Sequence, residues 1–279
     1  MSLAAKLPRI ASALRGLVKY PTAILNPLDE KNKQDHVARV HGLSQGLPSV
    51  DLLELFPDFD EVVDPYSFLG GTSLPVDLAL LKALARGYPE CRYFEIGTWR
   101  GESVANVASV AASCTSLSLS AREMEELGFF APGSGFEKTH RFFSEGIPNI
   151  RYIEHNSRTY DFSQLGERFD LIFVDGDHTY EGVRSDTANV FNLLRDERSV
   201  IVWHDYAFTP ELVRWSVLAG ILDGCPPDRR GKLYHVSNTM CAIYTERPLK
   251  GSFAPFPRVP DKVFSVSMRA RRVEGAQPG

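Results

Sequence analysis

Two short apolar segments, each ending in acidic residues, constrain the fold of this chain most. DLIFVD (170–175) and SVIVWHD (199–205) are apolar at nearly every position, as a strand covered on both faces must be. The segment between them, 182–195, places Val183 and Val190 on one side of a helix. Strand, helix and strand in this order predict two parallel strands joined by a right-handed crossover.

The same alternation extends on both sides of this unit. Further β-rich runs are RYFEI (92–96), TSLSLS (115–120), NIRYIEH (149–155), KLYHV (232–236) and TMCAIYTE (239–246). Ser237-Asn238 separates the last two, which is typical of a closing hairpin. We therefore expect an α/β fold with a doubly wound, mostly parallel, seven-stranded Rossmann-like sheet and an antiparallel closing hairpin. Residues 1–65 are expected to form an N-terminal helical cover, 66–250 the α/β domain and 251–279 an extended basic tail.

Composition limits the classes of partner. Lys and Arg number 31 against 35 Asp and Glu, a net charge of −4, so the basic excess of a nucleic-acid-binding protein is absent. Small-molecule partners are favoured, and a homo-oligomer is an open expectation. Four cysteines without a CxxC pair predict neither a disulfide framework nor a zinc cluster. No transmembrane segment is expected and the predicted location is cytoplasmic, while Lys6, Arg9, Arg15 and Lys19 predict at most a weak membrane-surface contact.

The end of the first sheet strand carries a glycine-containing turn. Glu95 precedes Gly97, and Gly101 opens the next helix. Gly97 permits a tight turn and Gly101 permits close approach of a backbone or a ligand. The pattern is neither GxGxxG nor a P-loop, and an acid two residues before the first glycine suits an amine better than a pyrophosphate. A generic βα turn is the alternative interpretation.

E-x-G-x-x-x-G after the first strand resembles motif I of class I S-adenosylmethionine-dependent methyltransferases. FDLIFVDGDHTYEGVRSD and SVIVWHDY resemble two later strand ends in one branch of that superfamily, the macrocin O-methyltransferase and cephalosporin hydroxylase-like proteins. The likeness covers roughly 66–246. It implies that S-adenosylmethionine is the cofactor, and that Glu95, Gly97, Thr98, Gly101 and Ser103 hold its methionine portion.

The resemblance has one departure at the end of the second strand. An acid that binds the ribose usually stands there, but this chain has Ser120, with Glu123 a few residues on. Either Ser120 substitutes, or Glu123 reaches back, or cofactor affinity is weak. Asn156 and Ser157 occupy the place that contacts adenine in the family; a simple polar turn is the alternative.

A second group of polar residues follows the two buried strands. Asp175, Asp177, His178, His204 and Asp205 fall at two neighbouring strand ends. Converging carboxylates repel one another unless a positive charge lies between them, and a divalent cation supplies one. The resemblance implies that Asp175, His204 and Asp205 are metal ligands and Asp177 the general base. Magnesium or manganese is the first expectation, with zinc or iron open because of the imidazole.

These observations predict an O-methyltransferase acting on a hydroxyl of a sugar or small metabolite. Asp177 or His178 would take the proton from the hydroxyl, as a general base. Two other functions stay open: a non-catalytic protein that kept the fold, and a metal-dependent hydroxylase or hydrolase. Local turns at Asp175 and Asp177, with a buried structural His204, are the corresponding alternative for the residues.

Overall fold

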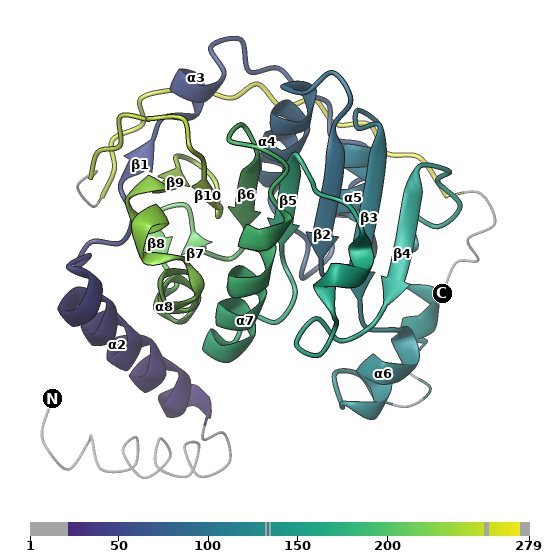
Figure 1. The fold of residues 1–279 in the computed structure, drawn as a ribbon. Coiled ribbons are helices and arrows are strands. Elements are labelled where there is room, and N and C mark those ends of the chain that lie inside the picture. Colours follow the sequence, from purple (N-terminus) through teal and green to yellow (C-terminus); the bar gives the residue numbers. More distant parts are fainter. Residues whose placement is uncertain (1–21, 132, 134, 254–256, 274–279) are drawn as a thin grey trace, which may run out of the picture.

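The computed structural model describes residues 22–131, 133, 135–253 and 257–273, and its ribbon is shown in Figure 1. A mostly parallel sheet of eight strands forms its centre, in the order β1-β9-β10-β6-β5-β2-β3-β4. The strands are β1 (Ser49–Val50), β2 (Arg92–Ile96), β3 (Ser113–Ser118), β4 (Ile150–Glu154), β5 (Leu171–Val174), β6 (Val200–Trp203), β9 (Leu233–Val236) and β10 (Ala242–Tyr244). A separate two-stranded ribbon pairs β7 (Ala207–Thr209) with β8 (Leu212–Val213).

The expectation of a doubly wound sheet with a closing hairpin is confirmed. β2, β3, β4, β5 and β6 pair in parallel, while β10 runs antiparallel to both β6 and β9. The expected count of seven strands is wrong, because β1 adds an eighth beside β9. This strand has only two residues, too few for any periodicity in the sequence.

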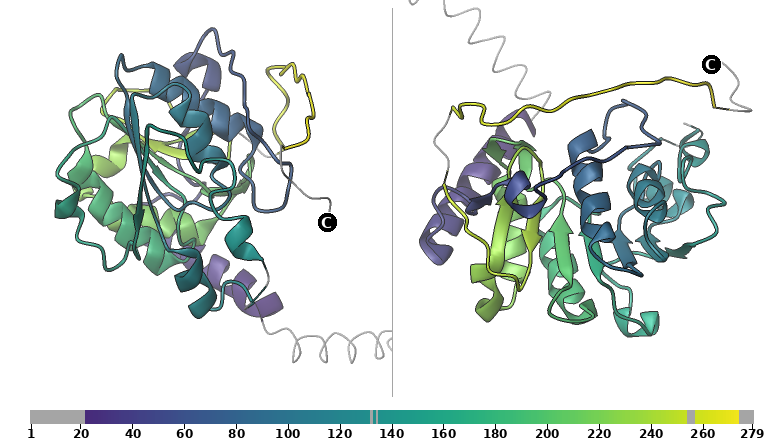
Figure 2. Two further views of the ribbon diagram at one scale, coloured as in Figure 1. Left: turned by 90° about the vertical axis from the view of Figure 1, so that its right-hand side faces the viewer. Right: turned by 90° about the horizontal axis from the view of Figure 1, so that it is seen from above.

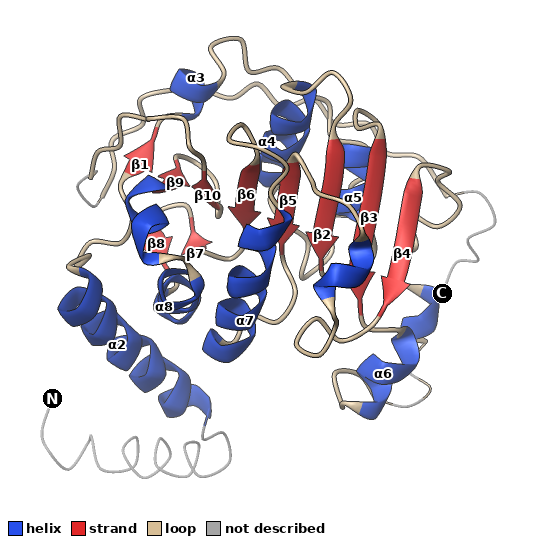
Figure 3. Cartoon of the chain, in the orientation of Figure 1, coloured by secondary structure: helices blue, strands red, loops and turns tan. Residues whose placement is uncertain are grey.

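Helices cover both faces of the sheet, as Figure 3 shows. The α-helices are α2 (Thr22–His41), α3 (Leu52–Leu55), α4 (Pro75–Arg86), α5 (Glu102–Ala108), α6 (Ala121–Glu126), α7 (Tyr180–Val190) and α8 (Trp215–Gly224). Short 3₁₀ helices are η1 (Phe136–Lys138), η2 (Phe162–Leu165), η3 (Phe191–Leu193) and η4 (Pro227–Lys232). Among the described residues, no helix is long and apolar enough to cross a bilayer.

Alternate residues of each central strand enter two different cores. Phe94 and Ile172 pack in a cluster with residues of α7 and α8, whereas Tyr93 and Phe173 pack with residues of α4 and α5. Successive strand side chains point to opposite faces, so a strand apolar throughout must be covered twice. This explains why the segments 170–175 and 199–205 do not alternate between apolar and polar residues.

Helix α2 is fixed to the α/β domain through α8. The Glu30 carboxylate accepts hydrogen bonds from the Trp215 and Ser216 backbone N–H groups, at 2.6 and 3.2 Å. Those groups lie at the N-terminus of α8, where a carboxylate is stabilised by free N–H donors and the helix dipole. Figure 1 shows α2 alongside α8. The basic stretch with Lys6, Arg9, Arg15 and Lys19 lies outside the described residues.

The described part of the tail is extended and carries no helix. Ser252 bridges to Ser49 of β1, and farther along Lys262 contacts Asp51 while Arg271 makes a double contact with Asp64. Figure 2 shows this segment, in yellow, passing along the molecule beside α3. Basic tail residues therefore meet the acidic segment that follows β1.

Candidate active site

The turn after β2 is built around a buried carboxyl group. Glu95 is fully buried, and its oxygens accept hydrogen bonds from the hydroxyls of Tyr93 (2.9 Å), Thr98 (2.8 Å) and Ser103 (3.0 Å). Burial raises the pKa of Glu95 to about 7, although these donors favour the ionised form. Glu95 thus ties strand, turn and helix together, and its carboxyl group faces the protein interior.

Both glycines of the turn are required by packing within the chain. Gly97 and Gly101 have positive φ values of 99° and 81°. A Cβ on Gly97 would lie 2.0 Å from the Asp175 carbonyl oxygen, and one on Gly101 would lie 2.0 Å from Ser144 Oγ. The turn after β2 therefore rests directly on the loop after β5. This contact joins the two candidate half-sites, the cofactor side at the ends of β2, β3 and β4 and the acidic side at the ends of β5 and β6.

The end of β3 presents a carboxylate one helical turn later than expected in the family. Ser120 caps α6, and Glu123 Oε2 accepts hydrogen bonds from the Ser120 backbone N–H and hydroxyl, both at 2.9 Å. The bond from the Ser120 backbone lowers the pKa of Glu123. Glu123 thus closes the capping box of its own helix, and its contact with the ribose, one of the three alternatives from the sequence, stays a prediction.

Arg141, which the sequence did not single out, lies beside the same strand end. Its guanidinium donates to Glu154 (2.9 Å), stands 3.5 Å from Ser118 Oγ and covers the ring of Tyr152 at 4.2 Å. Its φ is +60°, unusual for a residue with a side chain. Only the fold reveals it, because it comes from the loop between α6 and β4.

The loop after β4 forms a polar turn. Asn156 Oδ1 accepts from the Arg158 backbone N–H at 3.0 Å, which is an Asx-type turn. Ser157 lies next to Asp186 of α7, a fully buried carboxyl group whose pKa is raised by burial to about 7, with Ser157 acting to lower it. Asp186 also approaches Gly176, since a Cβ there would lie 3.4 Å from its oxygen.

Three carboxylates surround the imidazole of His204 at the end of β6. His204 Nδ1 lies 3.2 Å from Asp175 Oδ1 and 3.4 Å from Asp205 Oδ1, while Nε2 lies 3.2 Å from Asp77 Oδ2. Burial alone lowers the pKa of His204, but the charges and hydrogen bonds of Asp175 and Asp77 outweigh burial and hold it well above the usual value. The pKa of Asp175 is correspondingly lowered: burial raises it, and His204 more than offsets that.

Asp77 is the partner that sequence analysis missed. It lies at the third position of α4, where it accepts from the backbone N–H groups of Leu74 and Met240, both at 2.9 Å, in addition to His204. A proline at the start of the helix and an acid two residues later predict a helix cap. The same signal says nothing about a histidine 127 positions away.

Two further basic side chains meet Asp205 on its other oxygen. Arg214 Nη1 lies 3.1 Å and His178 Nε2 lies 3.3 Å from Asp205 Oδ2. Asp205 itself has a positive φ of 55°, which turns the chain sharply after β6. The sequence predictions placed Asp175, His178, His204 and Asp205 together, and these residues do converge.

Asp177 differs from its neighbours in the cluster. Its two oxygens accept from the backbone N–H and the hydroxyl of Thr179, at 2.9 and 2.8 Å. This is the local turn that was the alternative interpretation of Asp177. Asp177 precedes Thr179, the N-cap of α7, and each of its oxygens already accepts one hydrogen bond from that residue.

Asp175, His204 and Asp205 present a set of donor atoms that fits a divalent cation. Oxygens of Asp175 and Asp205 and Nδ1 of His204 all lie within 4.8 Å of one another. Asp77 on Nε2 supplies the carboxylate–histidine arrangement that orients a metal-bound imidazole. The charge repulsion that suggested a metal is, however, relieved in this structure by the His204 imidazolium and Arg214.

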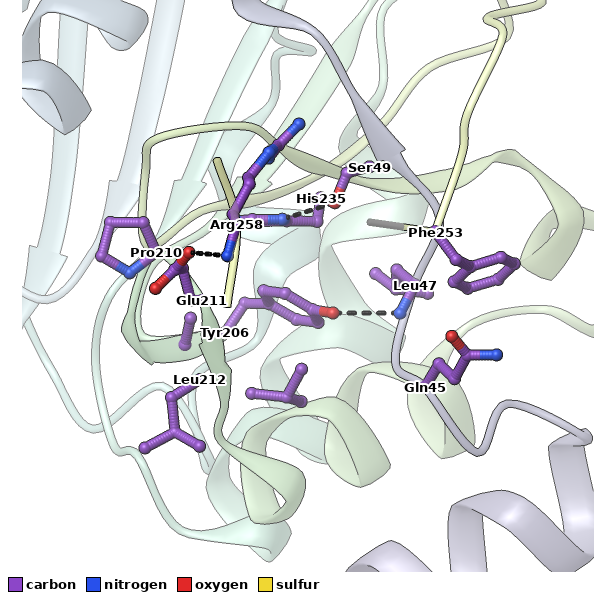
Figure 4. A pocket seen from close by; sticks show the side chains of 12 residues that line it. Gln45, Leu47, Ser49, Tyr206, Pro210, Glu211, Leu212, His235, Phe253 and Arg258 are labelled. Atoms are coloured by element: carbon purple, nitrogen blue, oxygen red, sulfur yellow. Dashed lines mark hydrogen bonds between the residues drawn. The ribbon is translucent and has the colours of Figure 1, made fainter. Parts of the chain in front are cut away.

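A small cavity of about 80 Å³ lies between the segment around β1, the β7–β8 ribbon and the tail (Figure 4). Tyr206 forms one wall, and its hydroxyl accepts from the Leu47 backbone N–H at 2.9 Å. Small-molecule pockets usually measure roughly 300–1,000 Å³. This cavity is too small for the cofactor, and Tyr206 is mainly a packing residue.

Comparison with known proteins finds a similarity in the central part of the chain. Residues 94–206 match the family model of a methyltransferase domain. No curated protein matches the sequence. The matched segment begins within β2 and ends just after the His204-Asp205 pair, so it contains the turn after β2 and the acidic residues after β5 and β6, but not Asp77 or Arg214.

Several solved structures are similar at low identity. They include CalS10, an amino pentose methyltransferase from Micromonospora echinaspora bound to S-adenosylmethionine (19% identity, TM-score 0.34, 48% of this chain and 51% of that one). PaMTH1 from Podospora anserina, bound to SAH, has 16% identity and TM-score 0.43 over 63% and 80% of the two chains. An O-methyltransferase from Bacillus cereus with SAH has 14% identity and TM-score 0.43 over 81% and 94%. The chain spans about half the length of CalS10. Residues 94–206 are thus similar to a methyltransferase domain.

Proposed function

We propose that this chain is an S-adenosylmethionine-dependent O-methyltransferase whose acceptor is a hydroxyl of a sugar or another small metabolite. The observation that carries the proposal is the contact between the turn after β2 and the loop after β5, through Gly97 and Asp175. It sets a turn resembling a cofactor-binding motif directly against a cluster able to bind and deprotonate a hydroxyl. The likeness to the macrocin O-methyltransferase and cephalosporin hydroxylase-like branch, most specific at DGDHTYEG, favours the same reaction.

The cofactor would lie across the ends of β2, β3 and β4. Thr98 and Gly101 with the start of α5 would face its methionine portion, Glu123 its ribose, and Asn156 with Ser157 its adenine. Because Glu95 is turned inward, we assign it the role of holding the turn in shape, and the methionine ammonium would meet the turn backbone instead.

The acceptor would lie at the ends of β5 and β6. Its oxygen attacks the methyl carbon, the carbon–sulfur bond breaks, and the hydroxyl proton moves to a base. We place that proton on His178, whose ring is half-exposed and is oriented by Asp205 at 3.3 Å. Asp205 also stabilises the imidazolium that forms, as a carboxylate does for a catalytic histidine. Asp177 is less suited because Thr179 already occupies its oxygens.

Asp175, His204 and Asp205 would hold a divalent metal, if one assists. Such an ion acts as a Lewis acid that lowers the pKa of a bound hydroxyl. His204 would then give up its Nδ1 proton and keep its Nε2–H on Asp77. Whether the ion or the imidazolium provides the positive charge is the question the following experiment answers.

Calorimetric titration of the full chain with S-adenosylmethionine, with and without manganese, tests the proposal. We expect the cofactor to bind in both conditions and manganese to bind the wild type. Asp175→Asn should lose manganese and keep the cofactor. Absence of cofactor binding would overturn the enzymatic proposal in favour of a non-catalytic protein. Cofactor binding without manganese binding would leave methyl transfer standing and remove the metal from it.

We also propose that 1–65 acts as a cover for the α/β domain of 66–250, with 251–279 as a tail. The loop that follows the cover is attached to the turn after β2, since the Arg100 guanidinium donates to the Gly70 carbonyl (2.9 Å) and to Thr72 Oγ1 (2.7 Å). A Cβ on Gly71 would lie 2.2 Å from the Trp99 ring. Bound cofactor should therefore slow proteolytic cleavage at Gly70-Gly71. Equal cleavage rates would contradict the cover.

A further inference from the structure

A second cluster of metal-ligand residues lies outside the candidate active site. His36 and His41 of α2 converge on Asp223 of α8. His36 Nε2 lies 2.8 Å from Asp223 Oδ2, and His41 Nε2 lies 2.8 Å from Asp223 Oδ1. The three candidate ligand atoms all lie within 4.8 Å of one another. Figure 1 shows the two helices side by side.

The position of the two histidines makes their convergence informative. Residues five apart on a helix point about 140° away from each other around its axis, so they do not normally share a face. Here they meet on both sides of one carboxylate, and the two rings are nearly perpendicular, at 76°, with centroids 5.8 Å apart. His41 achieves this as the last residue of α2.

The carboxylate is partly withdrawn from water and lies where a helix disfavours it. The side chains of His41 and Asp223 are only 4% and 18% exposed, and that of His36 is 30% exposed. Asp223 belongs to the last turn of α8, whose dipole places partial negative charge there. A cation between the carboxylate and the imidazoles would offset this repulsion.

The surroundings also supply an outer hydrogen bond. Tyr180 donates its hydroxyl to Asp223 Oδ2 at 2.8 Å, which orients the carboxylate as outer residues orient metal ligands. The ammonium of Lys33 lies over the Tyr180 ring at 3.3 Å, and Arg184 also contacts Tyr180. Both basic groups therefore contact Tyr180, whereas Asp223 is met by the imidazoles of His36 and His41.

We propose that His36, His41 and Asp223 form a binding site for Zn²⁺ or a similar borderline transition metal, which joins α2 to α8. Two imidazole nitrogens and one carboxylate oxygen, with water as a fourth ligand, are a common zinc donor set. Ligand atoms around tetrahedral zinc lie about 3.4 Å apart at bond lengths of about 2.0–2.2 Å. The present 2.8 Å separations join each imidazole to a different oxygen of Asp223. Binding through one of these oxygens would need the side chains to open around the ion, which replaces the protons between nitrogen and oxygen.

This site would hold α2 of the cover against α8 and would take no part in methyl transfer. Tyr180 belongs to the DGDHTYEG segment at the start of α7, so the site connects α2 to the loop that carries His178. The proposal is independent of methyl transfer, because none of its ligands belongs to the cofactor or acceptor positions.

Zinc binding to the full chain, measured by competition with a chromophoric chelator, tests the proposal. The wild type should bind one more equivalent than the double variant His36→Gln, His41→Gln. Glutamine keeps a hydrogen-bond donor toward Asp223 but offers no imidazole, so the fold is retained. Asp35→Asn is the matched control, because Asp35 lies on the same helix and pairs only with exposed Lys31 among the described contacts. It should bind zinc as the wild type does.

A separate arm distinguishes this site from the acidic cluster. Asp175→Asn should keep the extra equivalent, and cobalt bound to that variant should show the visible absorption of a tetrahedral site. With Asp175→Asn present in every protein compared, zinc should raise the Tm when His36 and His41 are retained, also alongside Asp35→Asn, and should not raise it when both histidines are glutamine. Equal zinc stoichiometry in wild type and double variant would overturn the proposal and leave a hydrogen-bonded contact between α2 and α8.

Discussion

The two halves of the candidate active site are held together in different ways. At the ends of β2 and β3, polar groups bond to neighbours a few residues away: Glu95 with Thr98, and Ser120 with Glu123. At the ends of β5 and β6, partners come from distant parts of the chain, as Asp77 and His204 show. Local hydrogen bonds shape a backbone for binding, whereas long-range charge pairs bring reactive groups together.

The largest expected effect concerns the base in the second half. His178→Gln should lower turnover by roughly 10²–10⁴, the usual contribution of a general base. Asp177→Asn should lower it much less, because Asp177 serves a capping turn. Methyl transfer from labelled S-adenosylmethionine to a panel of hydroxylated sugars measures both. The opposite ranking of the two variants would return the role of base to Asp177.

The next largest effect concerns stability, when Asp77, the buried partner of His204, is removed. Asp77→Ala leaves a buried imidazolium without one of its carboxylates and two backbone N–H groups without an acceptor. We expect a loss of about 3–5 kcal/mol in the free energy of unfolding, measured by urea denaturation. Asp35→Ala, an exposed acid, should change it by less than about 0.5 kcal/mol. Similar losses for both variants would show that the pair of Asp77 and His204 adds nothing to the free energy of unfolding beyond what an exposed acid does.

At the ends of β2 and β3, the buried Glu95 should make the stability of the fold depend on pH. Because the folded-state pKa of Glu95 is raised to about 7, its proton stabilises the folded protein at low pH. That contribution is complete below the unfolded value of 4.5 and is lost as pH rises to about 7, by up to about 3 kcal/mol. Glu95→Gln should remove this part of the slope, as denaturation curves between pH 4.5 and 7.5 would show. An unchanged slope would mean that Glu95 titrates normally.

A pair of glycines gives the smallest and most local test. Gly97→Ala and Gly128→Ala both force a side chain onto a positive φ, of 99° and 78°, but only Gly97 lacks space. Gly97→Ala should therefore destabilise by about 1–3 kcal/mol more, in the range of steric strain, and should weaken cofactor binding. Thermal unfolding and calorimetry compare the two. Equal effects would mean that only the positive φ requires glycine at position 97. The close contact with the loop after β5 would then not matter for stability.

The order of strands and helices could be predicted from the sequence because it depends on short-range periodicity. β2 has the expected bounds, and β5 and β6 lie within the expected runs. β1 could not be predicted, because its two residues become a strand only by pairing with β9 in the assembled sheet. Convergence of Asp175, His204 and Asp205 was predictable too, because the carboxyl ends of neighbouring parallel strands meet at one edge.

What the sequence determined by itself is therefore the doubly wound sheet, the edge that carries the polar residues and the kind of residue there. Tertiary structure alone decided which of these groups are charged and which are occupied. Asp77 reaches His204 from α4, Arg214 reaches Asp205 from the start of α8, and Glu95 turns inward. The physical reason is that strand periodicity acts over a few residues, whereas burial and charge pairing depend on neighbours that only the folded chain supplies.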